Sequence, residues 1–179
     1  IFYRAIAYSS AIFLFLFFKY RSNIILQITK IGTFGWLAGL VLGCSNVCFI
    51  LSMTSTTVAN SIFTISLIPF ITAVLAFFLL REKLARITIF TMISAFSGVF
   101  IMFYGSLQVG EIGGNMLALF TAVSFSIFTL ILRSNKAVDM LPCLLLSGLI
   151  AITVSFVVKM GSLQISLHDF LLCFLLGAV

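Results

Sequence analysis

The sequence predicts an all-α, polytopic helical membrane protein with about seven membrane-spanning segments. Hydrophobic residues make up 63% of the 179-residue chain, charged residues make up 8%, and the mean hydropathy is +1.32. Soluble domains carry about 25% charged residues, so this composition cannot cover a water-facing surface. The apolar runs are continuous and have the length of a transmembrane helix, whereas barrel strands alternate apolar and polar residues over about ten positions.

The predicted spans are apolar runs, most of them separated by short polar or charged connections. They cover Ile1–Phe18, Phe34–Met53, Val58–Leu80, Ile87–Tyr104, Asn115–Leu132, Leu141–Val158 and a last run that begins near Asp169 and reaches Val179. The chain starts without Met and stops inside an apolar run. We therefore expect it to be a fragment of a longer membrane protein.

Basic residues concentrate in alternate connections, which predicts the orientation of the spans. The connections after the first, third and fifth spans contain Lys19, Arg21, Lys30, Arg81, Lys83, Arg86, Arg133 and Lys136. These connections are expected to face the cytoplasm, because Lys and Arg accumulate on that side of a membrane. Topology thus accounts for the net charge of +6, and without a basic stripe we expect no nucleic-acid partner.

Small residues recur at intervals of four within several spans. They are Gly35, Gly39 and Gly43, then Ser94 and Gly98, then Ala118, Ala122 and Ser126, then Ser147, Ala151 and Ser155. Such faces let helix backbones approach closely in a lipid environment, where burial of apolar surface gives little drive to associate. We expect these faces to form the contacts between helices.

No residue pattern indicates a catalytic centre, a metal site or a cofactor. The four cysteines lie in apolar runs, and the single histidine, His168, is far from them in the sequence. A structural zinc site needs four Cys or His ligands at suitable spacing. All acidic residues fall at span ends or in connections, so the sequence shows neither an enzyme-like constellation nor a proton relay inside the membrane.

Arg4 and Tyr8 are candidate substrate-binding residues in the first span. Arg4 lies apart from the basic connections, and a charge there needs protein, water or a lipid headgroup as a neighbour. Two interpretations are open: Arg4 extends to the outer interface, or its guanidinium holds a carboxylate or phosphate of the substrate. Tyr8, one helical turn away, would add a hydroxyl contact on the same face.

Three further polar residues and one proline complete the candidate site. Asn46, Asn60 and Thr64 are expected either to hydrogen-bond between helices or to contact substrate in a cavity. Pro69 lies in the middle of the third span and is expected to bend that helix. We consider Pro69 a candidate hinge.

Four segments carry a resemblance to a known family. They are Thr56–Asn60, Ile68–Phe70, Leu79–Leu84 and Gly98–Ile101, and they combine a Pro-containing span, a Glu-basic pair at its cytoplasmic end and a Gly-Val in the next span. This arrangement resembles the first repeat of the EamA-like transporters of the drug/metabolite transporter superfamily. Gly114–Leu119, followed by Phe125 and Arg133, resembles the opening of the second repeat, and Phe2–Arg4 resembles the Arg-bearing start of the second helix.

The resemblance implies a ten-helix fold of two inverted five-helix halves, of which this chain would supply helices two to eight. Residues 1–105 would form the first repeat with four spans, truncated at its N-terminus. Residues 114–179 would form the second repeat with three spans, truncated at its C-terminus.

The function implied by the resemblance is secondary transport of small organic metabolites by alternating access. The substrates would be amino-acid-like, nucleotide-linked or amphipathic compounds, and the alternative is a multi-span receptor or structural membrane protein. The expected partners are a small-molecule substrate and membrane lipid, a homodimer is a candidate assembly, and the expected location is the cell's inner or plasma membrane.

Overall fold

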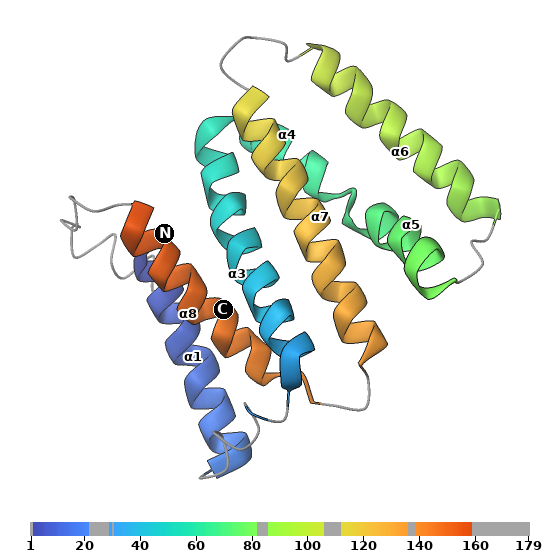
Figure 1. Ribbon diagram of the computed structural model, residues 1–179. Helices are drawn as coiled ribbons and strands as arrows, with labels where there is room; N and C mark the ends of the chain where they lie inside the picture. The colour runs from blue at the N-terminus through green and yellow to red at the C-terminus, as the bar shows by residue number, and fades with distance from the viewer. Residues whose placement is uncertain are drawn as a thin grey trace. The chain divides into compact units, whose positions relative to one another are not determined.

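The structure, a computed structural model, describes residues 2–21, 29, 31–81, 86–105, 112–135 and 139–158. Its elements are α1 (Phe2–Tyr20), α3 (Gly32–Ser55), α4 (Val58–Ile65), α5 (Ile68–Leu80), α6 (Arg86–Gly105), α7 (Ile112–Ser134) and α8 (Pro142–Val158), drawn in Figure 1. The predicted all-α fold is therefore confirmed. Every predicted span except the last coincides with these helices, and the last lies outside the described residues, as do Glu82 and His168.

The chain divides into two compact units, which are described separately. The first unit comprises residues 1–47 and 131–179, and the second comprises residues 48–130. Helix α3 belongs to the first unit up to Val47 and to the second unit from Cys48 on. Helix α7 belongs to the second unit up to Leu130 and to the first unit from Ile131 on.

In the first unit, α8 packs against α1 on one side and against α3 on the other. Helices α1 and α8 are antiparallel: Lys19, at the end of α1, meets Asp139, just before α8, while Ser9 lies against Gly148 in the middle of both helices. This arrangement agrees with the predicted topology, which puts the connections around Lys19 and Asp139 on the same side of the membrane.

Two glycines bring the backbone of α3 against α8. A Cβ atom on Gly39 would lie 2.8 Å from Cβ of Leu146, and one on Gly43 would lie 2.9 Å from the carbonyl oxygen of Ser147. Both distances are shorter than non-bonded atoms allow, so the helices can adopt this separation only with glycine at these positions. The predicted packing role of the glycine face is confirmed at Gly39 and Gly43.

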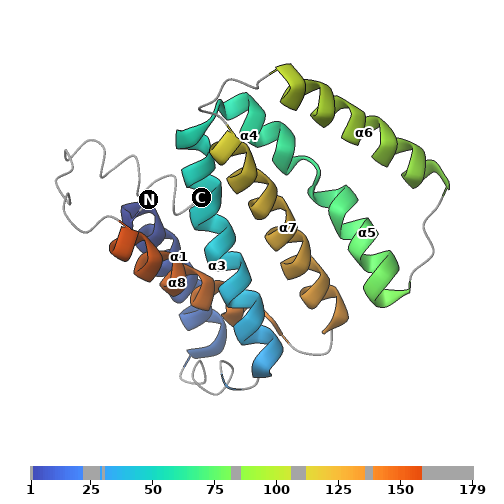
Figure 2. The same cartoon turned by 45° about the horizontal axis from the view of Figure 1, so that its top comes forward.

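In the second unit, the predicted third span consists of two helices, α4 and α5. Helix α4 begins after Thr57, whose side chain accepts a hydrogen bond from the backbone N–H of Asn60 at 3.3 Å, as expected of an N-cap residue. The helix ends at Ile65, and α5 starts after a two-residue turn, Ser66–Leu67. Figure 2 shows the two helices as separate segments joined by this turn.

Pro69 explains why the span breaks at this position. Proline has no backbone N–H, and its ring clashes with the carbonyl four residues earlier, here that of Ile65. The break therefore precedes the proline, which occupies the first turn of α5, where its fixed φ angle suits a helix start. The expected bend is thus present in the form of a complete interruption of the helix.

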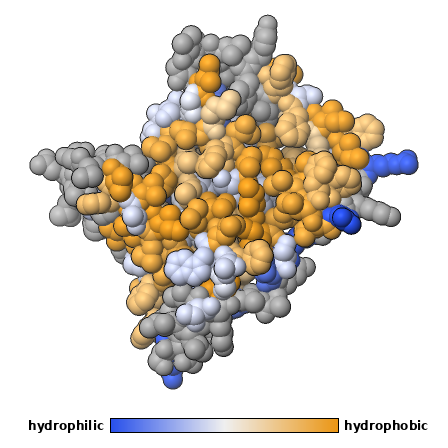
Figure 3. Space-filling view, in the orientation of Figure 1, coloured by the Kyte–Doolittle hydropathy of each residue, from blue (hydrophilic) through white to orange (hydrophobic). Residues whose placement is uncertain are grey.

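The described surface is largely apolar, and several polar side chains are buried among the apolar ones of the interior. Large hydrophobic side chains such as Phe78, Phe90 and Phe100, each more than 70% exposed, point outward from α5 and α6, whereas Asn60, Asn115 and several hydroxyl residues are buried. Figure 3 shows apolar side chains covering most of the visible face. Three stretches, 32–55, 58–80 and 112–134, are long and apolar enough to cross a membrane. The exterior is therefore suited to lipid.

Replacing Gly43 with alanine tests the contact between α3 and α8. We expect Gly43→Ala to destabilise the detergent-solubilised protein by about 1–3 kcal/mol, the usual cost of overpacking, measured by unfolding in a denaturing detergent. Gly113→Ala is the matched control, because a Cβ atom at position 113 has no neighbour within 4 Å. Equal stability of the two variants would show that α3 does not approach α8 this closely.

Candidate functional site

Arg4 and Tyr8 lie one turn apart on α1, and both are half-buried. Tyr8 packs beside Gly148 of α8, and its hydroxyl lies next to Ser147. Among the described residues, no hydrogen bond or ion pair of Arg4 occurs.

Asn46 lies on α3, also in the first unit and half-buried. It follows Gly39 and Gly43 at helical spacing, so it extends the face on which α3 approaches α8.

Asn60 and Thr64 are buried together on α4, in the second unit. The Thr64 hydroxyl donates to the carbonyl oxygen of Asn60 at 2.8 Å, and the Asn60 amide donates to the Thr56 hydroxyl at 3.5 Å. The structure thus brings these two residues together, as their spacing predicted. Their polar groups are engaged in hydrogen bonds within the protein.

A second helix completes this polar cluster, and the sequence did not indicate it. The Thr56 hydroxyl donates to Oδ1 of Asn115 on α7 at 2.9 Å, and the hydroxyls of Ser52 and Ser61 are 2.7 Å apart. A Cβ atom on Gly114 would lie 2.6 Å from the backbone of Ser55, so the start of α7 touches the end of α3. The available signal was an Asn in the first turn of an apolar helix, but its partner is 59 residues away.

The predicted site residues therefore fall into two groups. Arg4, Tyr8 and Asn46 belong to the first unit, and Asn60, Thr64 and Pro69 belong to the second. Whether both groups contact one solute stays a prediction.

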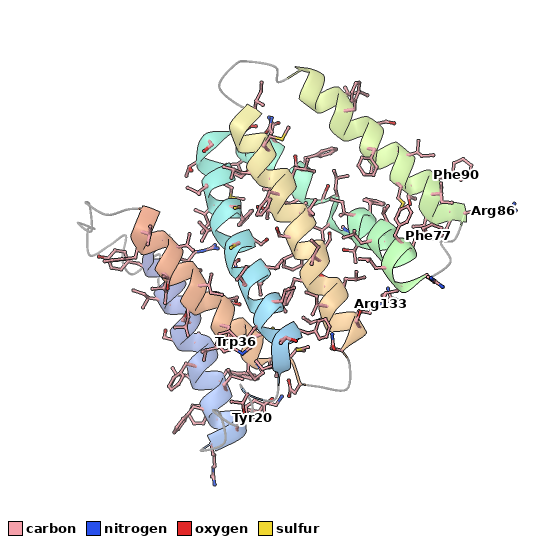
Figure 4. All side chains as sticks on the ribbon, viewed as in Figure 1. Tyr20, Trp36, Phe77, Arg86, Phe90 and Arg133 are labelled. Carbon is pink, nitrogen blue, oxygen red and sulfur yellow. The ribbon has the colours of Figure 1, made fainter. Side chains whose placement is uncertain are left out.

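Charged and amphipathic side chains lie at helix ends. Figure 4 shows Tyr20 at the end of α1, Trp36 in the first turns of α3, Arg86 at the start of α6 and Arg133 in the last turn of α7. Trp36 is 55% exposed, which agrees with a side chain at the membrane interface rather than in a cavity wall.

Lys19 and Tyr20 tie the end of α1 to the segment before α8. Both donate to Oδ2 of Asp139, the Lys19 ammonium at 2.8 Å. The hydrogen bond from Lys19, followed by that from Tyr20, lowers the pKa of Asp139 from 3.8 to about 2, and the same contact with Asp139 raises the pKa of Lys19. These residues lie outside the predicted spans, at the end of the first unit that the charge pattern predicts to be cytoplasmic.

Among the described residues, no group of three or more His, Cys, Asp or Glu side chains could hold a metal ion. Cys44, Cys48 and Cys143 lie in apolar helices and form no disulfide within the described part of the chain. The arrangement as a whole, with an apolar exterior, buried amides and hydroxyls, and helices of membrane length, defines an α-helical integral membrane protein.

The sequence model of the EamA-like transporter family matches residues 1–104, more than half of the 179-residue chain. The chain belongs to this family and is therefore a membrane transporter of the drug/metabolite transporter superfamily. No curated protein and no solved structure matches the chain. The family is one of transporters rather than enzymes.

The stabilising effect of the ion pair between Lys19 and Asp139 should depend on pH. Because the pKa of Asp139 is lowered in the folded protein, its stabilising effect is present above pH 3.8 and is lost as the pH falls toward 2. The pKa of Lys19 is raised, so its effect is lost only as the pH rises above 10.5. We expect a double-mutant cycle of Lys19→Met and Asp139→Asn to show a small favourable coupling at pH 7, as for exposed pairs, and a weaker one at pH 3.

Arg21 provides the control for this cycle, since it is a neighbouring cation at the end of α1. Arg21→Gln combined with Asp139→Asn should show no coupling in thermal unfolding of the solubilised protein. A coupling energy between Lys19 and Asp139 that is the same at pH 3 and pH 7 would contradict the ion pair.

Proposed function

We propose that this chain is part of a secondary transporter that moves small organic solutes across the cell's inner or plasma membrane by alternating access. The observation that carries the proposal is the interrupted span α4–α5, whose break is buried on one face, at Thr64 and Leu67, and exposed on the other, at Ser66 and Pro69. Discontinuous helices near the middle of the bilayer recur in secondary transporters, where they form solute sites and move between states. Family membership favours this function over a receptor or a purely structural protein.

Amino-acid-like, nucleotide-linked and amphipathic compounds are the substrate classes that we propose. Arg4 would bind an anionic group of the solute, and Tyr8 and Asn46 would add neutral polar contacts. Asn60 and Thr64 are buried and hydrogen-bonded in the conformation described here. We therefore assign them to solute contact in a conformation in which α4 moves away from α7, with Pro69 at the hinge.

Counterflow in vesicles tests the proposal. Vesicles containing the purified protein would be loaded with an unlabelled solute and diluted into a trace of the same labelled solute, using representatives of each class. We expect transient accumulation of label for one class, because a carrier that alternates its access exchanges solute across the membrane faster than it dissipates the gradient. A correctly inserted protein that gives no counterflow with any class would contradict the proposal.

Arg4→Lys distinguishes a substrate contact from an interfacial anchor. Lysine retains the charge and can still extend to the interface, but it lacks the planar pair of donors that binds carboxylate or phosphate. For an anionic solute identified by counterflow, we expect a half-saturation concentration raised about tenfold or more, because a hydrogen bond to a charged group contributes about 1.5–3 kcal/mol.

Arg21→Lys, at the opposite end of α1, is the matched control and should transport as the parent does. Arg4→Ala should lose affinity at least as strongly as Arg4→Lys. Parent-like uptake by both Arg4 variants would assign Arg4 to the interface alone.

A further inference from the structure

Ser126 of α7 makes a hydrogen bond to the backbone of the interrupted span. Its hydroxyl lies 3.1 Å from the carbonyl oxygen of Ile68 and 2.8 Å from that of Ala122 in its own helix. The side chain is fully buried. Ile68 is the first residue of α5, immediately after the turn that separates the two helices, so Ser126 contacts the span just beyond its break.

Helix α7 runs parallel to the interrupted span and contacts the chain at two places, just before α4 and at the first residue of α5. On the α4 side, Thr56, just ahead of the helix, bonds to Asn115, and on the α5 side Ile68 bonds to Ser126. The two pairs have nearly the same sequence offset, 59 and 58 residues, as parallel helices in one register require. Asn115 and Ser126 are roughly 16 Å apart along the α7 axis.

Helix α7 is continuous, whereas the span that it contacts is divided into α4 and α5. Helix α7 has 23 uninterrupted residues, and between its two tie points it presents Ala118 and Ala122, both fully buried. The partner span consists of two helices joined only by turn hydrogen bonds, such as that from the N–H of Leu67 to the carbonyl of Thr64 at 3.2 Å. An external contact on each half is therefore needed to set the angle between them.

We infer that Ser126 is a positioning residue that holds α5 at its observed angle to α4. The importance of this angle for transport rests on the proposed function, but the positioning itself does not. The Ser126 hydroxyl has one proton, which it shares between the carbonyl oxygens of Ile68 and Ala122 in a three-centre hydrogen bond. Helix α7 is held by its own backbone hydrogen bonds, so loss of the Ser126 hydroxyl releases α5 without interrupting α7.

Thr129 offers a matched comparison on the same helix. Its hydroxyl donates to the carbonyl of Phe125 at 2.9 Å, the same local bond that Ser126 makes to Ala122. Ser126→Ala removes both the local and the interhelical bond, whereas Thr129→Ala removes a local bond alone. The difference between the two variants isolates the contact with the interrupted span.

The distance between spin labels on the two halves reports their angle directly. Labels at Ile62 on α4 and Phe78 on α5 suit this purpose, because both side chains are exposed, 55% and 72% respectively. They would be attached to introduced cysteines, in a protein whose native cysteines are replaced, and measured by pulsed dipolar spectroscopy in nanodiscs without solute. We expect one narrow distance distribution in the parent and in Thr129→Ala, and a broader distribution with a shifted mean in Ser126→Ala.

Helical content and the thermal unfolding midpoint would be measured for each variant, and we expect Ser126→Ala to stay folded. A distribution in Ser126→Ala that matches the parent would overturn the inference, as would equal broadening in Thr129→Ala. Loss of the folded protein in Ser126→Ala would also overturn it, since the bond would then serve stability. These outcomes are independent of counterflow, so failure of the transport proposal would leave the positioning role intact.

Discussion

In a hydrocarbon environment, every backbone N–H and carbonyl must find a partner within the protein, and the described structure follows from this constraint. It explains why the apolar runs form helices, and why the interruption between α4 and α5 lies against α7. At that interruption, Ser66 donates through its backbone to Ile62 and through its hydroxyl to Phe63, while Ser126 reaches Ile68 from α7. The turn thus keeps its polar groups paired although the helix has ended.

The same environment decides how the helices associate. Apolar side chains gain little by leaving lipid for protein, so close backbone approach and interhelical hydrogen bonds take over. Glycines bring α3 against α8 and the start of α7 against the end of α3. The buried pair of Ser52 and Ser61 and the part-buried bond between Thr56 and Asn115 then join the helices. Aromatic side chains, by contrast, cover the exterior.

The sequence predicted the helices closely, because length and apolarity determine a span locally. The limits expected for the third span, Val58–Leu80, are those found, and the bend at Pro69 was expected from the missing N–H. The helix breaks at Ser66–Leu67, before the proline, because the Pro69 ring would clash with the carbonyl of Ile65. The bend was expected at Pro69 itself, and the sequence did not indicate this position. The packing of Gly39 and Gly43 followed from their spacing, although the identity of α8 as their partner did not.

The partners of the polar residues could not be predicted in this way. Thr64 and Ser66 bond to the carbonyl oxygens of Asn60 and Phe63, which their positions near Pro69 did not indicate. Asn115 and Ser126 meet residues 59 and 58 positions earlier, and nothing in their local sequence indicates which helix will lie opposite. Such contacts depend on the register between helices, which is a property of the folded chain.

The two halves of the interrupted span differ in length, so a rotation at the turn moves the far end of α5 further than the far end of α4. Helix α4 has 8 residues and α5 has 13, so the arms on either side of the turn measure about 12 and 20 Å. A rotation of about 10° at the turn displaces the far end of the longer arm by about 3.4 Å, more than the width of a water molecule. A small change of the angle at the turn is thereby amplified at the end of α5 that carries Arg81.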